Sequence, residues 1–246
     1  MRDILESWGA EIVMTRVTNT TADDLPLSQI AEIANTNNVD FFQSIHSNAS
    51  TLQVNHPLML FRGYTDDPVY PLAKEMGSIM WNDLLEGHKW CVWNGQGENN
   101  IGDWSFYPQW GTQGLGVLRT LEMPGTLSEG SFHDYIPESW RLMNLDFRKY
   151  EAWLLAQSFL EFNQAGSLGF GLVAGVVRDM NVSVYDYYYI ENSDDGKKPV
   201  NNISVKLKNT AHTYTGDALN NGFYMMDSVP AGSYTLVVEA EGYMRD

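Results

Sequence analysis

The sequence predicts a layered α/β/α domain with a mixed, partly parallel sheet, followed by a small all-β sandwich domain. In the first part of the chain, segments with strand character alternate with segments of helical periodicity, which is typical of layered α/β folds. Beyond residue 171 the helical periodicity ends, and short strand-like segments alternate with turns rich in Asn, Asp and Gly. We therefore expect domains at residues 1–163 and 172–246, joined by a linker of small residues at 164–171.

The composition is that of a globular protein and restricts its partners. The 246 residues are 43% hydrophobic and carry a formal net charge of −16. An acidic surface disfavours non-specific binding to nucleic acid, and no segment reaches the roughly 18 apolar residues of a membrane span. The single cysteine, Cys91, excludes an internal disulfide, and its neighbours Trp90 and Val92 favour a packed thiol over a nucleophile.

The elements of the first domain follow from periodicity. Residues 1–8 have helical spacing without a preceding cap, so we interpret them as the end of a helix in a chain that lacks its beginning. Further helices are expected at 25–37, 68–86, 137–144 and 146–163. Strands are expected at 10–16, 39–48, 57–63 and 115–121, with a short one leading to Glu129. The apolar start of residues 39–48 predicts a strand buried on both faces.

Residues 88–114 interrupt this alternation and contain four tryptophans, Trp90, Trp93, Trp104 and Trp110. A long loop in a compact domain often serves binding, and aromatic rings beside polar side chains suit sugar rings. Packing of the tryptophans onto the domain is the other interpretation, and it is slightly favoured.

The second domain is expected to hold strands at 173–177, 203–208, 222–226 and 234–239. It contains no catalytic cluster, and His212 is most simply a surface residue.

His46 and Glu129 are the residues with the clearest chemical potential. Each follows a predicted strand, and sites in open α/β sheets lie at the carboxyl ends of strands. A histidine ligand and a carboxylate base together suit a zinc hydrolase. The alternatives are a hydrogen-bonded histidine at a strand end and an exposed loop glutamate. Spacing alone does not decide, because the chain has no His-Glu-x-x-His motif and offers one convincing ligand where zinc needs about three.

A resemblance to a known family indicates the roles that residue spacing alone leaves open. Over roughly residues 1–163 the chain resembles the zinc-dependent N-acetylmuramoyl-L-alanine amidases. The matching segments are residues 8–16, Leu27 and Asn35, Asp40-Phe-Phe-Gln-Ser-Ile-His-Ser-Asn48, Leu118-Arg119, Pro124-Gly-Thr-Leu-Ser-Glu129 and Phe132.

The resemblance implies that His46 binds Zn²⁺ and that Glu129 is the catalytic carboxylate. It implies two further ligands, a histidine and a glutamate, upstream of Trp8. The chain departs from the family pattern at Ile30, where arginine is usual, and at Gly130-Ser-Phe132, where x-Gly-Phe is usual. His133 and Asn48 are accessory candidates beside the two main residues.

Residues 172–246 resemble the carboxypeptidase regulatory-like β-domains of secreted bacterial proteins. The matching segments are Gly175-Val-Val177, residues 199–205, Asn221-Gly-Phe-Tyr224, Val229-Pro-Ala-Gly-Ser-Tyr234 and Gly242-Tyr243. Such modules are structural or adhesive.

The resemblances together imply a peptidoglycan hydrolase that cleaves the amide between N-acetylmuramic acid and L-alanine through zinc-activated water. They imply action in the bacterial cell envelope, in the periplasm or outside the cell, and impaired activity for a chain without the upstream ligands. Two alternatives are a zinc carboxypeptidase, which needs a His-x-x-Glu pair that this chain lacks, and a non-catalytic protein that binds cell-wall glycan or mediates adhesion.

Overall fold

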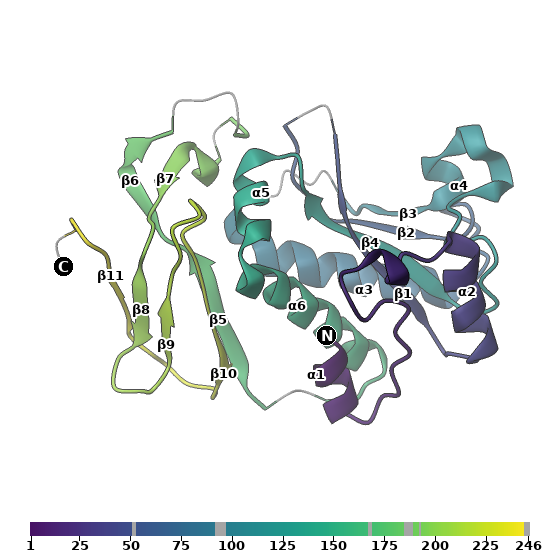
Figure 1. The fold of residues 1–246 in the computed structure, drawn as a ribbon, viewed down its shortest axis with the longest axis horizontal. Coiled ribbons are helices and arrows are strands. Elements are labelled where there is room, and N and C mark those ends of the chain that lie inside the picture. Colours follow the sequence, from purple (N-terminus) through teal and green to yellow (C-terminus); the bar gives the residue numbers. More distant parts are fainter. Residues whose placement is uncertain (51–52, 92–96, 167–168, 185–188, 192, 244–246) are drawn as a thin grey trace.

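The computed structural model describes residues 1–50, 53–91, 97–166, 169–184, 189–191 and 193–243 (Figure 1). The helices described in its α/β part are α1 Arg2–Ser7, α2 Leu27–Thr36, α3 Pro71–His88, α4 Asp103–Phe106, α5 Ile136–Met143 and α6 Leu145–Phe162. The described strands of its main sheet are β1 Phe42–Asn48, β2 Leu58–Phe61, β3 Asn100–Gly102 and β4 Gly125–Phe132. Short 3-10 helices lie between these elements and in the later part of the chain, namely η1 Thr21–Asp23, η2 Lys89–Cys91, η3 Pro108–Gln113 and η4 Asp194–Gly196.

The main sheet is mixed, with the strand order β1-β4-β2-β3. β1 and β4 are parallel, β2 and β3 are parallel, and β2 runs antiparallel to β4. The partly parallel sheet between helical layers confirms the predicted fold class. No helix in the described part of the chain is both long and apolar enough to cross a membrane.

The sheet has an apolar core on each face. On one face, α2 and the segment 115–123 pack against Phe42, Leu60 and Leu127. On the other face, α3 and α6 pack against Met59. The expected helices at 25–37, 68–86, 137–144 and 146–163 are therefore present with small shifts in their bounds.

Three strand predictions differ from the structure. Residues 10–16 form no strand, and β1 is an edge strand rather than one buried on both faces, with Ile45 50% exposed. Residues 115–121 form turns instead, because the amides of Leu118 and Arg119 both bond to the carbonyl of Leu115. This local bonding directs the side chains of Val117, Leu118 and Leu121 into the apolar core between α2 and the sheet.

The segment 88–114 supplies an element that the sequence pattern did not predict. β3 lies within it and pairs with β2, so part of the expected loop belongs to the sheet. Asp103 follows β3 and is buried, and its carboxylate accepts hydrogen bonds from the amides of Gly63 and Leu115. These bonds fix the loop to the neighbouring turns.

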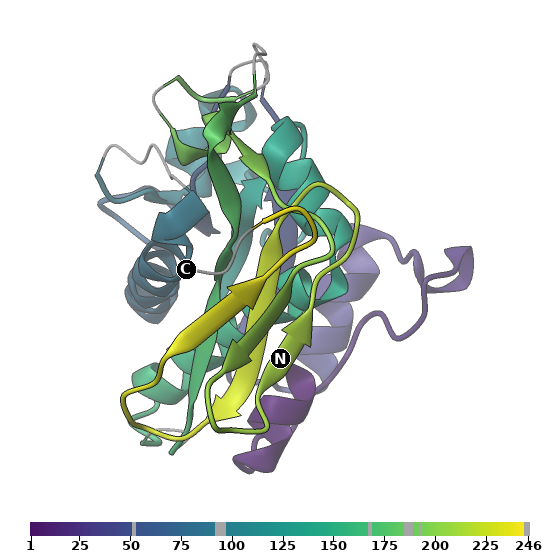
Figure 2. The same ribbon diagram turned by 90° about the vertical axis from the view of Figure 1, so that its left-hand side faces the viewer.

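The described residues within 171–243 form a unit built mainly of β-strands, which we call the sandwich (Figure 2). Its described strands are β5 Gly171–Val176, β6 Arg178–Ser183, β7 Lys197–Pro199, β8 Ser204–Leu207, β9 Thr213–Thr215, β10 Phe223–Val229 and β11 Leu236–Glu239. They form the sheets β10-β5, β11-β8-β9 and β6-β7. The four strand segments expected from the sequence correspond to β5, β8, β10 and β11.

The sandwich packs directly onto the α/β part, with β5 and β10 beside α6 (Figure 1). Phe223 of β10 is fully buried and contacts the rings of Phe147 and Tyr150 in α6. Asn144 caps α6 by accepting from the amides of residues 146 and 147, and its Nδ2 donates to Asp217 of the sandwich at 2.8 Å. The contact therefore combines apolar burial with specific hydrogen bonds.

Candidate active site

His46 and Glu129 lie opposite each other on the adjacent parallel strands β1 and β4, where they are register partners. Directly opposite residues project from the same face of a sheet. This face is the one covered by α2, because Phe42 and Leu127 lie an even number of residues earlier and enter that core. The parallel pairing thus brings together two residues from distant segments of the chain.

The strand β4 changes its register immediately after Glu129. His46 pairs with Glu129 and Asn48 pairs with Phe132, so two residues of β4, Gly130 and Ser131, lie opposite one residue of β1. Such a bulge bends the strand and re-aims the neighbouring side chains, and bulges are frequent beside active sites. Glu129 therefore lies inside β4, at the end of its regular pairing, rather than after the strand as the sequence pattern suggested.

Glu129 is the more chemically distinctive of the two residues. Its side chain is partly buried, and its Oε2 atom has no hydrogen-bond partner among the described residues. Burial raises the pKa of the carboxyl group to about 7, against a lowering effect of His133. A carboxyl group with a pKa near the working pH can both accept and donate a proton, which is the requirement for general acid–base catalysis.

His46 is exposed on the same face, and its Nε2 atom lies 3.0 Å from the hydroxyl of Ser44. Partial desolvation lowers the pKa of the imidazole from its usual value. The neutral form therefore dominates at pH 7, and this is the form that coordinates a metal or accepts a proton.

Asn48 and His133 tie the ends of the two strands together. The backbone amide of His133 donates to the carbonyl of Asn48 at 2.9 Å. The Nδ1 atom of the His133 ring lies 3.0 Å from the carbonyl of Ser47. The side chain of Asn48 accepts from the amide of Ala49 at 2.8 Å. Both accessory candidates therefore lie where β1 and β4 end, with His133 near enough to influence the charge of Glu129.

The other histidines occupy packed or remote positions. His56 contacts the ring of Phe132, with 4.9 Å between ring centroids. His88 is buried, which lowers the pKa of its imidazole to about 3, and its Nδ1 lies 3.0 Å from the carbonyl of Leu84. His212 lies in the sandwich, where its Nε2 is 3.3 Å from the carbonyl of Ser228.

The donor set does not complete a zinc site. Within the described ranges, no group of three or more His, Cys, Asp or Glu side chains is placed to hold a metal ion. His46 and Glu129 supply one imidazole and one carboxylate, whereas a protein zinc site uses about three ligands. Cys91 is buried, which raises the pKa of its thiol, so a packed thiol is the better description. The residues described here do not by themselves fit the ion.

The four tryptophans have different surroundings. Trp90 packs at the contact with the sandwich, where it stacks on Phe223 with 5.9 Å between ring centroids. Trp93 lies outside the described residues. Trp104 contacts Tyr64 edge-on, while Trp110 is 46% exposed and stacks on Tyr107 at 4.3 Å. Trp90 thus has a packing role in the structure, and Trp110 has the most accessible ring of the three that the structure describes.

Several residues near the site carried no signal in the sequence. Glu151 of α6 is buried against the backbone of Gly130. Asn55, Glu138 and Arg141 are buried and joined by hydrogen bonds just beyond the end of β4. An i, i+3 spacing of Glu and Arg on a helix usually indicates an exposed pair, so only the packing of the sandwich over α5 reveals this cluster.

Comparison with known proteins identifies the family. A layered α/β sheet with a register-paired histidine and carboxylate at its edge suits a hydrolase. The family model described as N-acetylmuramoyl-L-alanine amidase matches residues 1–158. The chain therefore belongs to the N-acetylmuramoyl-L-alanine amidase family, a class of hydrolases that act on the peptidoglycan of the cell wall.

Solved structures of this class align with about two thirds of the chain. Ami1 of Mycobacterium abscessus superimposes with a TM-score of 0.50 at 19% identity, over 66% of this chain and 72% of that one. AmiC2 of Nostoc punctiforme has a TM-score of 0.48 at 22% identity, over 66% of this chain and 77% of that one. An amidase of Clostridium difficile 630 has a TM-score of 0.47 at 19% identity, over 68% and 81%. A search of curated protein sequences gave no match.

Proposed function

We propose that this protein hydrolyses the amide between N-acetylmuramic acid and the L-alanine of the peptidoglycan stem peptide. The observation that carries the proposal is the register pairing of His46 with Glu129, a partly buried carboxylate whose pKa is near 7. Family membership supports the amidase over the zinc carboxypeptidase alternative.

In this proposal Glu129 takes the proton from the attacking water and passes it to the leaving amine of L-alanine. Both transfers need a carboxyl group that changes its protonation readily near neutral pH. The partly desolvated position of Glu129, whose Oε2 has no partner among the described residues, supplies that property.

Zn²⁺ is the proposed cofactor, with His46 as one ligand. Because the described residues supply fewer donors than zinc needs, we assign no step to the ion and propose that these 246 residues alone are impaired in hydrolysis. His133 and Asn48 are proposed to hold together the ends of the strands that carry His46 and Glu129, and Trp104 and Trp110 are proposed to contact the glycan. The sandwich is proposed to be a non-catalytic, carboxypeptidase regulatory-like module, and the protein is proposed to act in the bacterial cell envelope.

The test uses protein expressed from its complete reading frame, supplied with Zn²⁺ and incubated with purified peptidoglycan. The measurement is chemical labelling of newly freed α-amino groups, followed by identification of N-terminal L-alanine. Glu129→Gln should reduce the release about 100-fold or more, in line with the loss of a general base. Glu122→Gln is the matched control, because Glu122 is an exposed carboxylate near the start of the same strand.

Full release by the Glu129→Gln variant would contradict the role of Glu129. If the wild-type protein bound peptidoglycan but freed no L-alanine, the non-catalytic glycan-binding alternative would replace the amidase proposal.

A further inference from the structure

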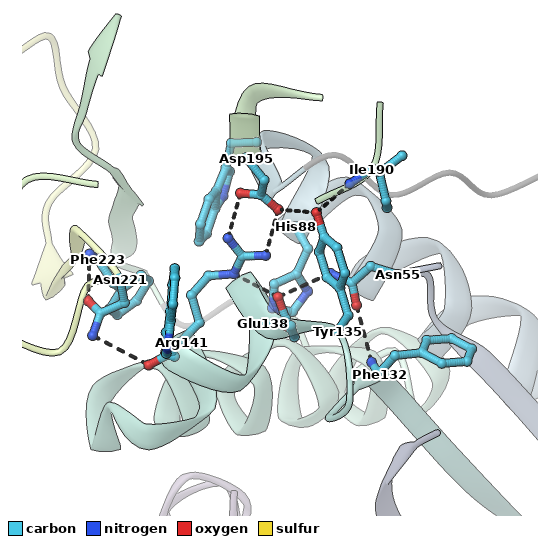
Figure 3. Close-up of polar contacts among 12 residues, drawn as sticks. Asn55, His88, Phe132, Tyr135, Glu138, Arg141, Ile190, Asp195, Asn221 and Phe223 are labelled. Carbon is cyan, nitrogen blue, oxygen red and sulfur yellow. Dashed lines mark hydrogen bonds and ion pairs between the residues drawn. The ribbon is translucent and has the colours of Figure 1, made fainter. Parts of the chain in front are cut away.

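A buried ion-pair network joins the sandwich to the α/β part (Figure 3). The guanidinium of Arg141 in α5 donates to both carboxylate oxygens of Asp195 in η4, at 2.8 and 3.0 Å. Both side chains are 2% exposed. Arg178 of β6 donates to the same carboxylate at 2.8 Å. Asp195 therefore receives two guanidinium groups, one from each side of the contact.

The network continues from Arg141 to the end of β4. The Nε of Arg141 donates to Glu138 Oε2 at 2.6 Å, and Asn55 donates to the same oxygen at 3.1 Å. The side-chain oxygen of Asn55 then accepts from the backbone amide of Phe132 at 3.1 Å. Glu138 and Asn55 are both 0% exposed, and Figure 3 shows these side chains aligned between η4 and the end of β4.

The amide of Phe132 lies where β2 no longer pairs with β4, whereas β1 still pairs with it through Asn48. Pairing of β2 with β4 ends at Leu58 and Glu129, and the bulge follows at once. Asn55, which precedes β2, takes the next hydrogen bond in place of a strand. On the β2 side, Glu129 is thus the last paired residue of β4, and Asn55 bonds the strand at Phe132 just beyond it.

The network is balanced in charge, so its members depend on one another. Two guanidiniums face two carboxylates, and removal of one carboxylate leaves buried positive charge without compensation. If Asp195 loses its charge, Glu138 is the buried carboxylate that still pairs with Arg141 among the described residues. Without the bonds from Arg141 to Asp195, the guanidinium would be less fixed, and a displacement of Arg141 would carry Glu138 with it and weaken the bond that orients Asn55.

We infer that Asp195, a residue of the sandwich, is a positioning residue for Glu129. It acts through Arg141, Glu138 and Asn55, and it holds the end of the strand that carries the carboxylate. The inference rests on the proposed function for its catalytic consequence, whereas its structural part concerns β4 alone. The sandwich is in this sense a component of the active site and not only an appended module.

The test compares Asp195→Asn with Asp194→Asn in the protein expressed from its complete reading frame. Both changes remove one carboxylate from the same turn, but Asp194 is exposed. Two quantities are measured, the kcat and KM for peptidoglycan hydrolysis and the hydrogen-exchange rate of the Phe132 amide by NMR. For Asp195→Asn we expect kcat to fall about 10- to 100-fold with KM within about twofold, the range for loss of a supporting contact. The Phe132 amide should exchange faster than in the wild type, and Asp194→Asn should change neither quantity.

An Asp195→Asn variant that keeps the wild-type kcat and Phe132 exchange rate would overturn the inference. So would a loss that appears in the control as well. If the wild-type protein hydrolyses nothing, the proposed function fails, and the exchange rate alone decides whether Asp195 controls the strand.

Tyr135→Phe is the second variant, for the case in which Asp195→Asn does not fold. It removes the hydroxyl that donates to Asp195 at 3.1 Å and keeps the ring in place. We expect a smaller fall in kcat, about threefold, with unchanged KM, and an unchanged kcat would count against the inference.

Discussion

The carboxylate of Glu151, in α6, lies against the backbone of Gly130, the residue that follows Glu129 in β4. A Cβ atom at Gly130 would overlap Oε1 of Glu151. Burial, followed by the charges of Glu138 and Glu129, raises the pKa of Glu151 to about 8. The bulge after Glu129 thus rests on a buried acid that favours its protonated form, and both the steric contact and the protonation can be tested.

Gly130→Ala should destabilise the protein by about 1–3 kcal/mol, because the added methyl group forces the buried carboxylate or the strand to move. The free energy of unfolding from denaturant titration measures this. Gly171→Ala is the control, because a Cβ there meets only the carbonyl of Val229 at 3.7 Å. Equal stability of both variants would show that Glu151 moves away at no cost.

Glu151→Gln should alter the pH dependence of stability. The folded-state pKa of about 8 lies above that of the unfolded chain, so the folded state binds more protons between roughly pH 4.5 and 8. The contribution of the Glu151 carboxyl group to the free energy of unfolding is fully present below about pH 4.5, and it is lost as the pH rises toward about 8. The glutamine variant should therefore gain about 1–3 kcal/mol relative to the wild type between roughly pH 5 and 8.5. The free energies of unfolding of both proteins are measured at each of these pH values. The same change with pH in the wild type and the variant would refute the prediction.

Glu129→Gln should stabilise the fold while it removes activity. At about pH 8 the wild type keeps a partly buried carboxylate ionised although burial opposes this charge, and an amide is less costly to bury. We expect a gain of about 0.5–2 kcal/mol in the free energy of unfolding at about pH 8, and less at about pH 5. A less stable variant at the higher pH would show that the carboxylate is well solvated or paired in solution.

Phe223→Ala should destabilise both parts of the molecule together. The ring is fully buried among Trp90, Phe147 and Tyr150, so its removal should cost about 3–5 kcal/mol. Tryptophan fluorescence and far-UV circular dichroism should report one shared, lowered transition. An unfolding transition that affects the sandwich alone would show that the contact contributes little to the α/β part.

Zn²⁺ should bind these 246 residues weakly. The described donors around His46 are too few for a structural site, so competition with a chelating dye should detect no tight stoichiometric ion. His46→Ala should reduce the residual binding, and His212→Ala, in the sandwich, should leave it unchanged. Tight binding would mean that His133 or His56 completes the donor set.

The sequence identified the helices better than the strands. The periodicity of α2, α3 and α6 is a local property, because a helix makes its hydrogen bonds within one segment. Strands depend on distant partners, so β3 was missed inside an expected loop, and residues 115–121 have strand-like composition but bond locally as turns. Neither error was visible without the pairing.

The candidate site likewise has features that were predicted from the sequence and features that were seen only in the structure. Spacing alone did not decide the roles of His46 and Glu129, and the family resemblance of the motifs around them led to the prediction of both as site residues. The bulge after Glu129, the acid beneath Gly130 and the Asp195 network depend on segments that pack together from separate parts of the chain.

Periodicity and motifs are properties of contiguous residues, so they could indicate the fold class and lead to the predictions of two domains and of His46 and Glu129 as site residues. The pairing and packing of distant segments place the two side chains on one face, Trp90 against Phe223, and Asp195 of the sandwich against Arg141 of α5. A local pattern does not reveal these relationships, because register, burial and the partners of a buried charge are set by which distant segments meet.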